Sequence, residues 1–147
     1  MLKQNETGKF RGQPVGVVLG GDSDERDVSL RTGRALSEAL KSLGYDVTVY
    51  DVPSDLGRLV ADRPAAVLLG LHGGSGENGV MQGFFEALKI PYSASGGLDS
   101  ALAMDKARAK AILRSADVTT PASNIIHSGE AIDTVAIGAT LGWPVVA

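Results

Sequence analysis

The sequence has 147 residues, which suffices for one domain and a short part of a second. Apolar residues make up 44% and charged residues 21%, the usage of ordinary globular proteins, so disordered, collagen-like and coiled-coil chains are excluded. The formal net charge is -3 without a long run of either sign, so we expect small-molecule partners rather than a nucleic acid or a membrane.

Cysteine is absent, which excludes a disulfide framework, thiol catalysis and thiolate metal ligands and agrees with a cytoplasmic location. Two histidines are few for a zinc site, and we predict no metal-ligating residue. Glycine occurs 19 times, about twice its average usage. The positions of these glycines therefore guide the search for a site.

From Val15 onward, short apolar runs alternate with helical patterns, as in β-α-β units. Residues 1–14 are polar and lack an apolar targeting segment, so we expect a frayed tail. Strands are predicted at Val15–Leu19 and Val47–Val52, and helices at about Asp24–Leu43 and Leu56–Ala61.

The continuous apolar run Ala65–Leu71 is typical of a parallel strand that helices cover on both faces. A glycine-rich loop, His72–Gly79, follows it. Next come a helix with Met81, Phe85 and Leu88 on one face and a brief strand at Ile90–Ser93. We predict an α/β fold with an open, mostly parallel, doubly wound sheet, and its strand order stays open.

In the last third of the chain, Leu98–Met104 has room for a helical turn or two, and Asp105 can cap a helix through about Ala116. Pro121 closes the predicted first domain, residues 15–120. Residues 121–147 are predicted to begin a second domain with a strand at Ile125–Ile126, a helix at Ile132–Leu141 and a strand from Pro144.

The segment Gly20–Leu30 joins the first strand to the first helix. In open α/β sheets, ligands gather at the carboxyl ends of strands, where glycines admit a ligand and the helix N-terminus offers free N–H groups. The alternative is helix capping, because Asp22 with Glu25, or Asp24 with Asp27, has the spacing of a capping box. The segment lacks the G-x-G-x-x-G dinucleotide pattern.

The loop His72–Gly79 carries four glycines in eight residues, which indicates left-handed turns, a close approach by a ligand, or both. His72 would emerge at the ligand edge of the sheet, as a site residue or as a hydrogen-bonded linker. Glu77 could pair with a basic group or serve as a helix N-terminal acid. A Walker A pattern is absent.

A third segment holds Ser93–Gly97 and the helix that begins near Asp105. Lys106 and Lys110 share a face of that helix, which either faces a phosphate or is simply solvated. His127 has no accompanying polar motif, and we interpret it as a surface or packing residue.

Together these segments resemble the N-terminal part of the D-alanine–D-alanine ligases, a family of ATP-grasp enzymes. The resemblance runs from about Val15 to the end of the chain. Four motifs occur in the family's order: Gly-Gly-x-Ser-x-Glu-Arg-x-Val-Ser-Leu at 20–30, Leu-His-Gly at 71–73 with Gly-Glu-x-Gly-x-x-Gln-Gly at 76–83, Pro-Tyr-x-x-Ser-Gly at 91–96, and Ala-Met-Asp-Lys at 103–106.

The resemblance implies a pre-ATP-grasp domain followed by the first strand-helix-strand of a central ATP-grasp domain. It implies an enzyme of peptidoglycan synthesis that uses ATP and Mg²⁺ to join two D-alanines through an acyl phosphate. It also implies a homodimer that pairs through this domain. The chain alone is expected to be inactive, because the later parts of the ATP site lie outside it.

The resemblance also implies roles for individual residues. Glu25 should hold the ammonium of the first D-alanine, and His72 should lie beside the same substrate, both as catalytic residues. Ser29 and Gly73 complete the expected substrate contacts. Lys106 matches a family lysine that reaches the nucleotide phosphates.

Two positions depart from the family's usual pattern: Asp27 stands in place of Glu, and Asn78 in place of Asp. The family's magnesium ligands have no counterpart in this sequence. Two other hypotheses remain open: a stand-alone module that binds an amino acid or a nucleotide, and a non-catalytic protein that keeps the dimer surface.

Overall fold

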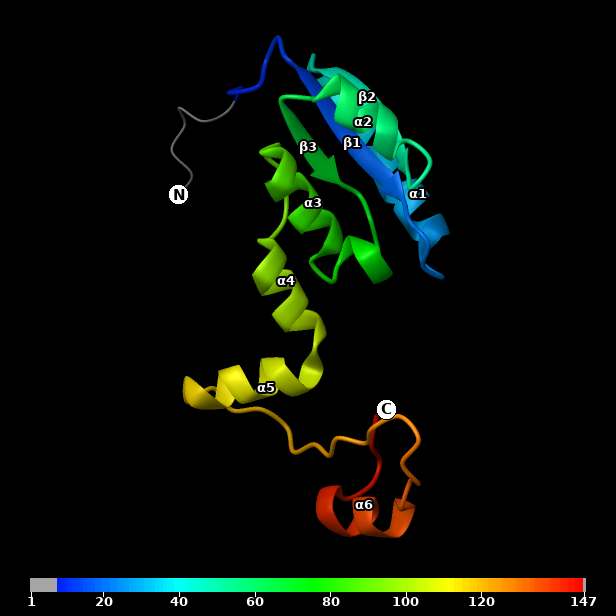
Figure 1. Cartoon of the computed structure of the whole chain (residues 1–147), viewed down its shortest axis with the longest axis vertical. Coiled ribbons are helices and arrows are strands. Elements are labelled where there is room, and N and C mark those ends of the chain that lie inside the picture. The colour runs from blue at the N-terminus through cyan, green and yellow to red at the C-terminus, as the bar shows by residue number, and fades with distance from the viewer. Residues whose placement is uncertain (1–7, 147) are drawn as a thin grey trace. The chain divides into compact units, whose positions relative to one another are not determined.

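The computed structural model describes residues 8–146 (Figure 1). Contacts divide the chain into two units, Met1–Met104 and Asp105–Ala147, and the predicted boundary at Pro121 lies inside the second. In chain order the elements are β1 (Pro14–Gly20), α1 (Arg26–Ser42), β2 (Asp46–Val52), α2 (Leu56–Asp62), β3 (Ala66–Leu69), the 3-10 turn η1 (Gly74–Gly76), α3 (Val80–Leu88), α4 (Gly97–Met104), α5 (Lys106–Ser115) and α6 (Thr134–Leu141).

The described strands form one parallel sheet in the order β2-β1-β3. Val15 on β1 is in register with Val47 on β2 and with Ala66 on β3, so the carboxyl ends of the strands share one edge. Parallel strands need helical crossovers, and α1 and α2 supply them. The prediction of an α/β fold with a parallel sheet is confirmed.

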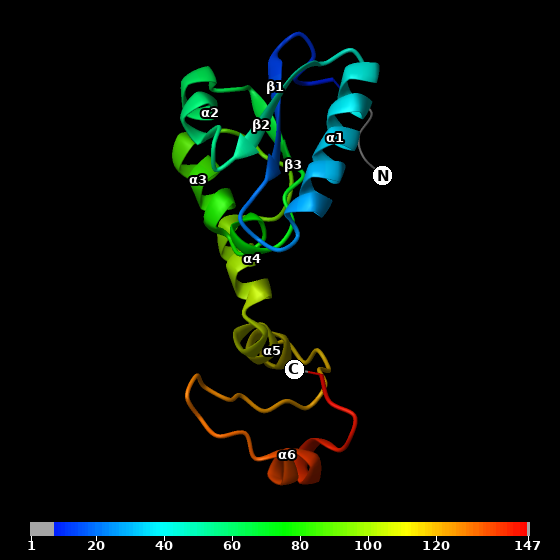
Figure 2. The same ribbon diagram turned by 90° about the vertical axis from the view of Figure 1, so that its right-hand side faces the viewer.

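Helices cover both faces of this sheet: α1 lies on one side, and α2 and α3 lie on the other (Figure 2). Alternation along β1 explains this arrangement, since successive side chains point to opposite faces of a strand. Leu19 faces α1, whereas Val18 belongs to the core on the α2–α3 side. Buried members of that core are Val18, Tyr50, Val52, Leu59, Val67, Leu71, Met81, Phe85 and Ile90.

Two glycines let α1 approach the sheet closely. A Cβ added to Gly33 would lie 2.4 Å from Cβ of Leu19, and one added to Gly70 would lie 2.9 Å from Cα of Gly33. Both distances are too short for a real side chain, so only glycine fits. The contact sets α1 directly against the chain that leaves β3.

The predicted strand Ile90–Ser93 is reduced to one parallel bridge between Val67 and Tyr92. The N–H of Val67 donates to the carbonyl of Pro91, and Ser93 donates its N–H back to Val67. The strand predicted at Ala65–Leu71 likewise ends at Leu69, since Leu71 already belongs to the following loop.

In the second unit, Asp105 caps α5 as predicted, because its carboxylate accepts the N–H of Arg108. Asp133 caps α6 in the same way. The strands predicted at Ile125–Ile126 and from Pro144 are not formed among residues 121–146. A strand needs a neighbour for its N–H and C=O groups, and the described part of this unit offers none.

Within residues 8–146, none of the helices is both long enough and apolar enough to cross a membrane.

Candidate functional site

The candidate site lies where the carboxyl ends of β1 and β3 meet. The loop 21–25 leaves β1, and the loop 70–79 leaves β3. Because both strands run parallel and adjacent, these two loops emerge at the same sheet edge.

Two hydrogen bonds tie the loops together. The hydroxyl of Ser23 donates to the carbonyl of His72 at 2.7 Å, and the hydroxyl of Ser75 donates to the Asp22 carboxylate at 3.2 Å. Helix α1 has Glu25 at its N-cap position without a side-chain capping bond. The capping-box alternative is therefore wrong for both pairs, since neither Asp22 nor Asp24 stands at the N-cap position, and the Asp22 carboxylate binds the neighbouring loop.

Three ionisable side chains meet at this edge: Glu25, His72 and Glu77. Each offers one atom, an imidazole nitrogen or a carboxylate oxygen, and these atoms lie within 4.8 Å of one another. Glu25 is exposed, and the other two are partly buried. The predicted convergence of Glu25 with His72 is present in the fold.

The two carboxylates of this group are uncompensated. Neither Glu25 nor Glu77 pairs with a basic side chain within residues 8–146, and neither carboxylate accepts a hydrogen bond there. Like charges so close favour a cation between them. The group can hold an ammonium or a metal ion.

The His72 ring is fixed by helix α1. Thr32 Oγ1 lies 3.0 Å from Nε2 of His72. On α1 and its cap, Glu25, Ser29 and Thr32 are spaced by four and then three residues, which places them on one helical face. Glu25 and Thr32 on that face lie at the loop after β3.

The absence of a side chain at Gly73 leaves space for the Glu25 carboxylate. Its φ is 65°, in the left-handed region, and a Cβ there would lie 2.8 Å from Ser23 Oγ and 3.4 Å from Glu25 Oε1. Any side chain at Gly73 would crowd the link between the loops. Gly73 therefore lies beside the three-residue group, and its expected contact with the substrate stays a prediction.

Ser29, in contrast, lies beneath the group. It has no exposed surface, and its hydroxyl accepts the N–H of Gly20 at 2.9 Å. In this structure Ser29 supports the turn that follows β1. Its expected contact with the substrate stays a prediction.

Arg26 anchors the start of α1 to β2. Its guanidinium donates to both carboxylate oxygens of Asp51, at 2.8 and 2.7 Å, and to the carbonyl of Gly21. The hydrogen bond to Asp51 raises the pKa of Arg26 above its usual value. Arg26 is thus engaged with the fold instead of the neighbouring Glu25.

Lys106 belongs to the second unit. It lines a cavity of about 270 Å³ together with Ala107, Lys110, Ser123, Asn124, Ile125 and Ile126. Lys110 shares this face of α5 with Lys106, and its ammonium donates to the carbonyl of Pro121 at 3.2 Å. His127 is exposed, and its backbone N–H donates to Glu130, which agrees with a surface residue.

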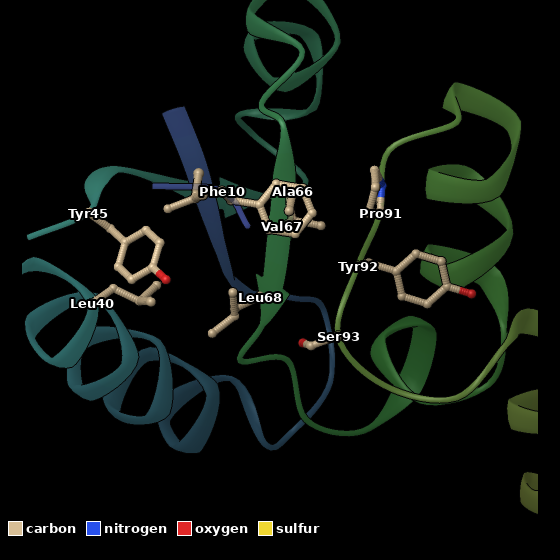
Figure 3. A pocket seen from close by; sticks show the side chains of 10 residues that line it. Phe10, Leu40, Tyr45, Ala66, Val67, Leu68, Pro91, Tyr92 and Ser93 are labelled. Carbon is tan, nitrogen blue, oxygen red and sulfur yellow. The ribbon is translucent and has the colours of Figure 1, made fainter. Parts of the chain in front are cut away.

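A second cavity, of about 210 Å³, lies at the other end of the sheet (Figure 3). Val15 and Ala66, at the amino ends of their strands, line it with Phe10, Leu40 and Tyr45. Its walls are mostly apolar and bring no cluster of ionisable groups, so the three-residue group remains the candidate site.

Two residues of the site were not assigned from sequence. Glu77 was expected to pair with a base or to precede a helix as an acid, yet it faces Glu25 and His72. Thr32, which contacts the His72 ring, was not predicted. The i, i+7 spacing from Glu25 to Thr32 is a signal that could have found it.

Curated relatives match most of this chain. D-alanine–D-alanine ligases from Methylorubrum populi, Methylobacterium radiotolerans and Desulforudis audaxviator are 48%, 50% and 47% identical over 80%, 82% and 90% of the chain. The chain spans only 38%, 39% and 44% of those relatives. No protein-family model matches it.

Solved structures similar to this chain belong to the same family as these curated relatives. The D-alanine–D-alanine ligase from Bacillus anthracis complexed with ATP superposes with a TM-score of 0.76 and 34% identity, over 86% of this chain and 44% of the other. The enzyme from Coxiella burnetii has a TM-score of 0.69 at 21% identity over 84% of this chain and 48% of the other, which supports the fold alone.

Proposed function

This chain is homologous to the N-terminal part of the D-alanine–D-alanine ligases, and on that premise we propose that it supplies half of a D-alanine site in an ATP-dependent ligase. In the proposed reaction, the γ-phosphoryl group of ATP passes to the carboxylate of one D-alanine. The amine of a second D-alanine then displaces phosphate, which forms the dipeptide of peptidoglycan synthesis.

The meeting of Glu25 with His72 at the ligand edge carries this proposal. A zwitterionic amino acid needs a counter-charge for its ammonium, and a carboxylate supplies a charge-assisted hydrogen bond. Glu25 is exposed and unpaired among the described residues, so it can accept that ammonium directly. Glu77 adds a second negative charge within reach.

In this proposal the imidazole of His72 lies beside the same substrate, and Thr32 holds its ring in place. Gly73 leaves space for the ligand next to Glu25. Ser29 acts on the site indirectly, because it holds the N–H of Gly20 in the turn below. The contribution of these groups is positioning and charge stabilisation.

ATP is the proposed co-substrate, since a structural relative was solved with it. Lys106 is the proposed phosphate contact. Lys110 and Asn124 line the same cavity. An ammonium suits the diffuse charge of a phosphate.

The described residues do not fit the magnesium ion of the whole enzyme. Mg²⁺ prefers near-octahedral oxygen ligands. The one group of three potential metal-ligating side chains within residues 8–146 includes the imidazole of His72. We therefore assign no Mg²⁺ ligand to the described residues. A cytoplasmic location and a homodimer complete the proposal, and sedimentation of the protein tests the latter.

Binding of D-alanine to the ¹⁵N-labelled chain tests the proposal. D-Alanine should shift the amide signals of residues 21–25 and 72–77, whereas L-alanine at the same concentration should shift them less. Glu25→Gln removes charge but little volume and should weaken D-alanine binding about tenfold or more, since a hydrogen bond to a charged group contributes about 1.5–3 kcal/mol.

Glu38→Gln on the exposed face of α1 is the matched control and should bind like the unmodified chain. Equal shifts with both enantiomers, or equal affinity for the Glu25→Gln variant, would count against the proposed site.

A further inference from the structure

The group formed by Glu25, His72 and Glu77 has the composition of a transition-metal site. It offers one imidazole nitrogen and two carboxylate oxygens, drawn from two loops, with all three atoms within 4.8 Å. Three protein ligands with an open fourth position are the usual pattern of accessible zinc sites.

We propose that Glu25, His72 and Glu77 bind a first-row divalent transition metal, with Zn²⁺ as the best-fitting ion. The imidazole decides the class of ion. Mg²⁺ and Ca²⁺ take oxygen ligands, whereas zinc, nickel and copper accept imidazole together with carboxylate. This inference concerns the ion alone and does not depend on the proposed reaction.

The distances between the ligand atoms of Glu25, His72 and Glu77 are short enough for these side chains to close around an ion. Zinc–ligand bonds of about 2.1 Å place tetrahedral ligand atoms about 3.4 Å apart. The present atoms are separated by up to 4.8 Å. Rotation of the exposed Glu25 side chain supplies the remaining approach, and it breaks no hydrogen bond because the carboxylate has none within residues 8–146.

The surroundings hold the ligands in place. Thr32 contacts one ring nitrogen of His72, which leaves Nδ1 without a partner among the described residues. Outer contacts of this kind orient metal-binding histidines. The bond from Ser23 to the carbonyl of His72 fixes the backbone of one ligand loop against the other.

The local charge also favours a cation. The nearest basic group along the chain, Arg26, is occupied by Asp51, on which its guanidinium makes two hydrogen bonds. The two carboxylates, Glu25 and Glu77, bring two negative charges that a divalent ion can neutralise.

The metal would share Glu25 with the ammonium proposed above. Zn²⁺ should therefore compete with D-alanine at this site, and it should inhibit a ligase that contains this chain. Free alanine also chelates zinc in solution through its amine and carboxylate, equally for both enantiomers. L-Alanine consequently corrects for chelation, and the excess effect of D-alanine measures competition on the protein.

Titration of Zn²⁺ against the 147-residue chain, in competition with a chromogenic chelator, tests the inference. We expect one ion per chain. His72→Ala and Glu77→Gln should each weaken Zn²⁺ binding by about 10- to 100-fold or more. Removal of a group that only supports a metal ligand already weakens metal binding by that factor, so the loss of a ligand itself should weaken it at least as much. His127→Ala changes the one other histidine of the sequence and should leave the affinity unchanged.

Circular dichroism of each variant verifies folding. Co²⁺ provides a second measurement, since its visible absorption reports the coordination number and geometry of the bound ion and should change in the His72→Ala variant. The inference is overturned if His72→Ala binds Zn²⁺ as tightly as the unmodified chain, if His127→Ala weakens binding equally, or if Mg²⁺ binds as well as Zn²⁺. If Zn²⁺ binds through His72 but D-alanine displaces it no better than L-alanine, the metal site stands and the proposed substrate site fails.

Discussion

The hydroxyl of Thr32 on α1 lies 3.0 Å from Nε2 of His72, although 40 residues separate them in sequence. The contact joins the helix that follows β1 to the loop that follows β3. It fixes the one aromatic side chain of the three-residue group from outside that group. The orientation of His72 thus depends on where α1 packs.

Thr32→Val should loosen the His72 ring while the fold persists, since valine keeps the shape but not the hydroxyl. We expect a changed ¹⁵N signal of the His72 ring nitrogens and D-alanine binding weaker by a few fold. Thr140→Val, in the last turn of α6, removes a comparable hydroxyl contact in the other unit and serves as control. Unchanged ring signals in the Thr32 variant would show that the contact does not hold the ring.

Gly33→Ala should strongly destabilise the first unit. The added Cβ would lie 2.4 Å from Cβ of Leu19, so α1 must move away from the sheet. Overpacking of this kind costs about 1–3 kcal/mol, and urea unfolding measures it. The same shift should pull Thr32 from His72 and weaken D-alanine binding.

Gly57→Ala is the matched control, because a Cβ at this exposed position of α2 meets nothing within 4 Å. It should leave stability unchanged or raise it by up to about 1 kcal/mol, since alanine favours a helix over glycine. Equal losses for both variants would contradict the close-packing argument.

Much of this architecture followed from local signals. The strand at Val15–Leu19 and the cap at Asp105 were predicted because a short apolar run and a capping residue are signals that span only a few residues. The convergence of Glu25 with His72 was also predictable, since adjacent parallel strands deliver their following loops to one edge.

The remaining errors have a common physical origin, which is packing between distant segments. Asp22 was a candidate cap, but Ser75 on the other loop takes its carboxylate. Ile125–Ile126 has strand composition, yet without a paired neighbour among the described residues it forms no strand.

Ser29→Ala should destabilise the chain even without any ligand. The buried N–H of Gly20 would lose its only side-chain acceptor, at a cost of about 1–3 kcal/mol. Ser37→Ala is matched in chemistry, helix and burial, but its hydroxyl has no hydrogen bond within residues 8–146, so it should be nearly neutral. Comparable urea midpoints for the two variants would show that the hydrogen bond from Gly20 to Ser29 does not stabilise the fold.

Glu86 should make stability depend on pH in the acidic range. The N–H of Gly97 and the hydroxyl of Tyr92 both donate to its carboxylate and hold the pKa of Glu86 below its usual value of 4.5. A depressed folded-state pKa means that the ionised group stabilises the fold above pH 4.5, and that this contribution is lost as the pH falls through the folded-state value.

Glu86→Gln should accordingly lower the urea midpoint at pH 7, and the difference from the unmodified chain should shrink below pH 4.5. Glu38→Gln, on an exposed position of α1, should show no such trend. A difference that stays constant from pH 7 to pH 3 would mean that the carboxylate charge does not link α3 to α4.

Substitutions of Glu25 and of Lys106 should affect the KM values of different substrates in a ligase that contains this chain. Glu25→Gln should raise the KM for the first D-alanine about tenfold or more and leave the KM for ATP nearly unchanged, because in the proposed site it removes a charged hydrogen-bond partner of the ammonium alone. Lys106→Ala should do the reverse, since its ammonium is assigned to the nucleotide phosphates. Lys41→Ala, in the last turn of α1, is the control for lysine removal. If both variants raised the same KM, then either the assignment of Glu25 to D-alanine or the assignment of Lys106 to ATP would be wrong.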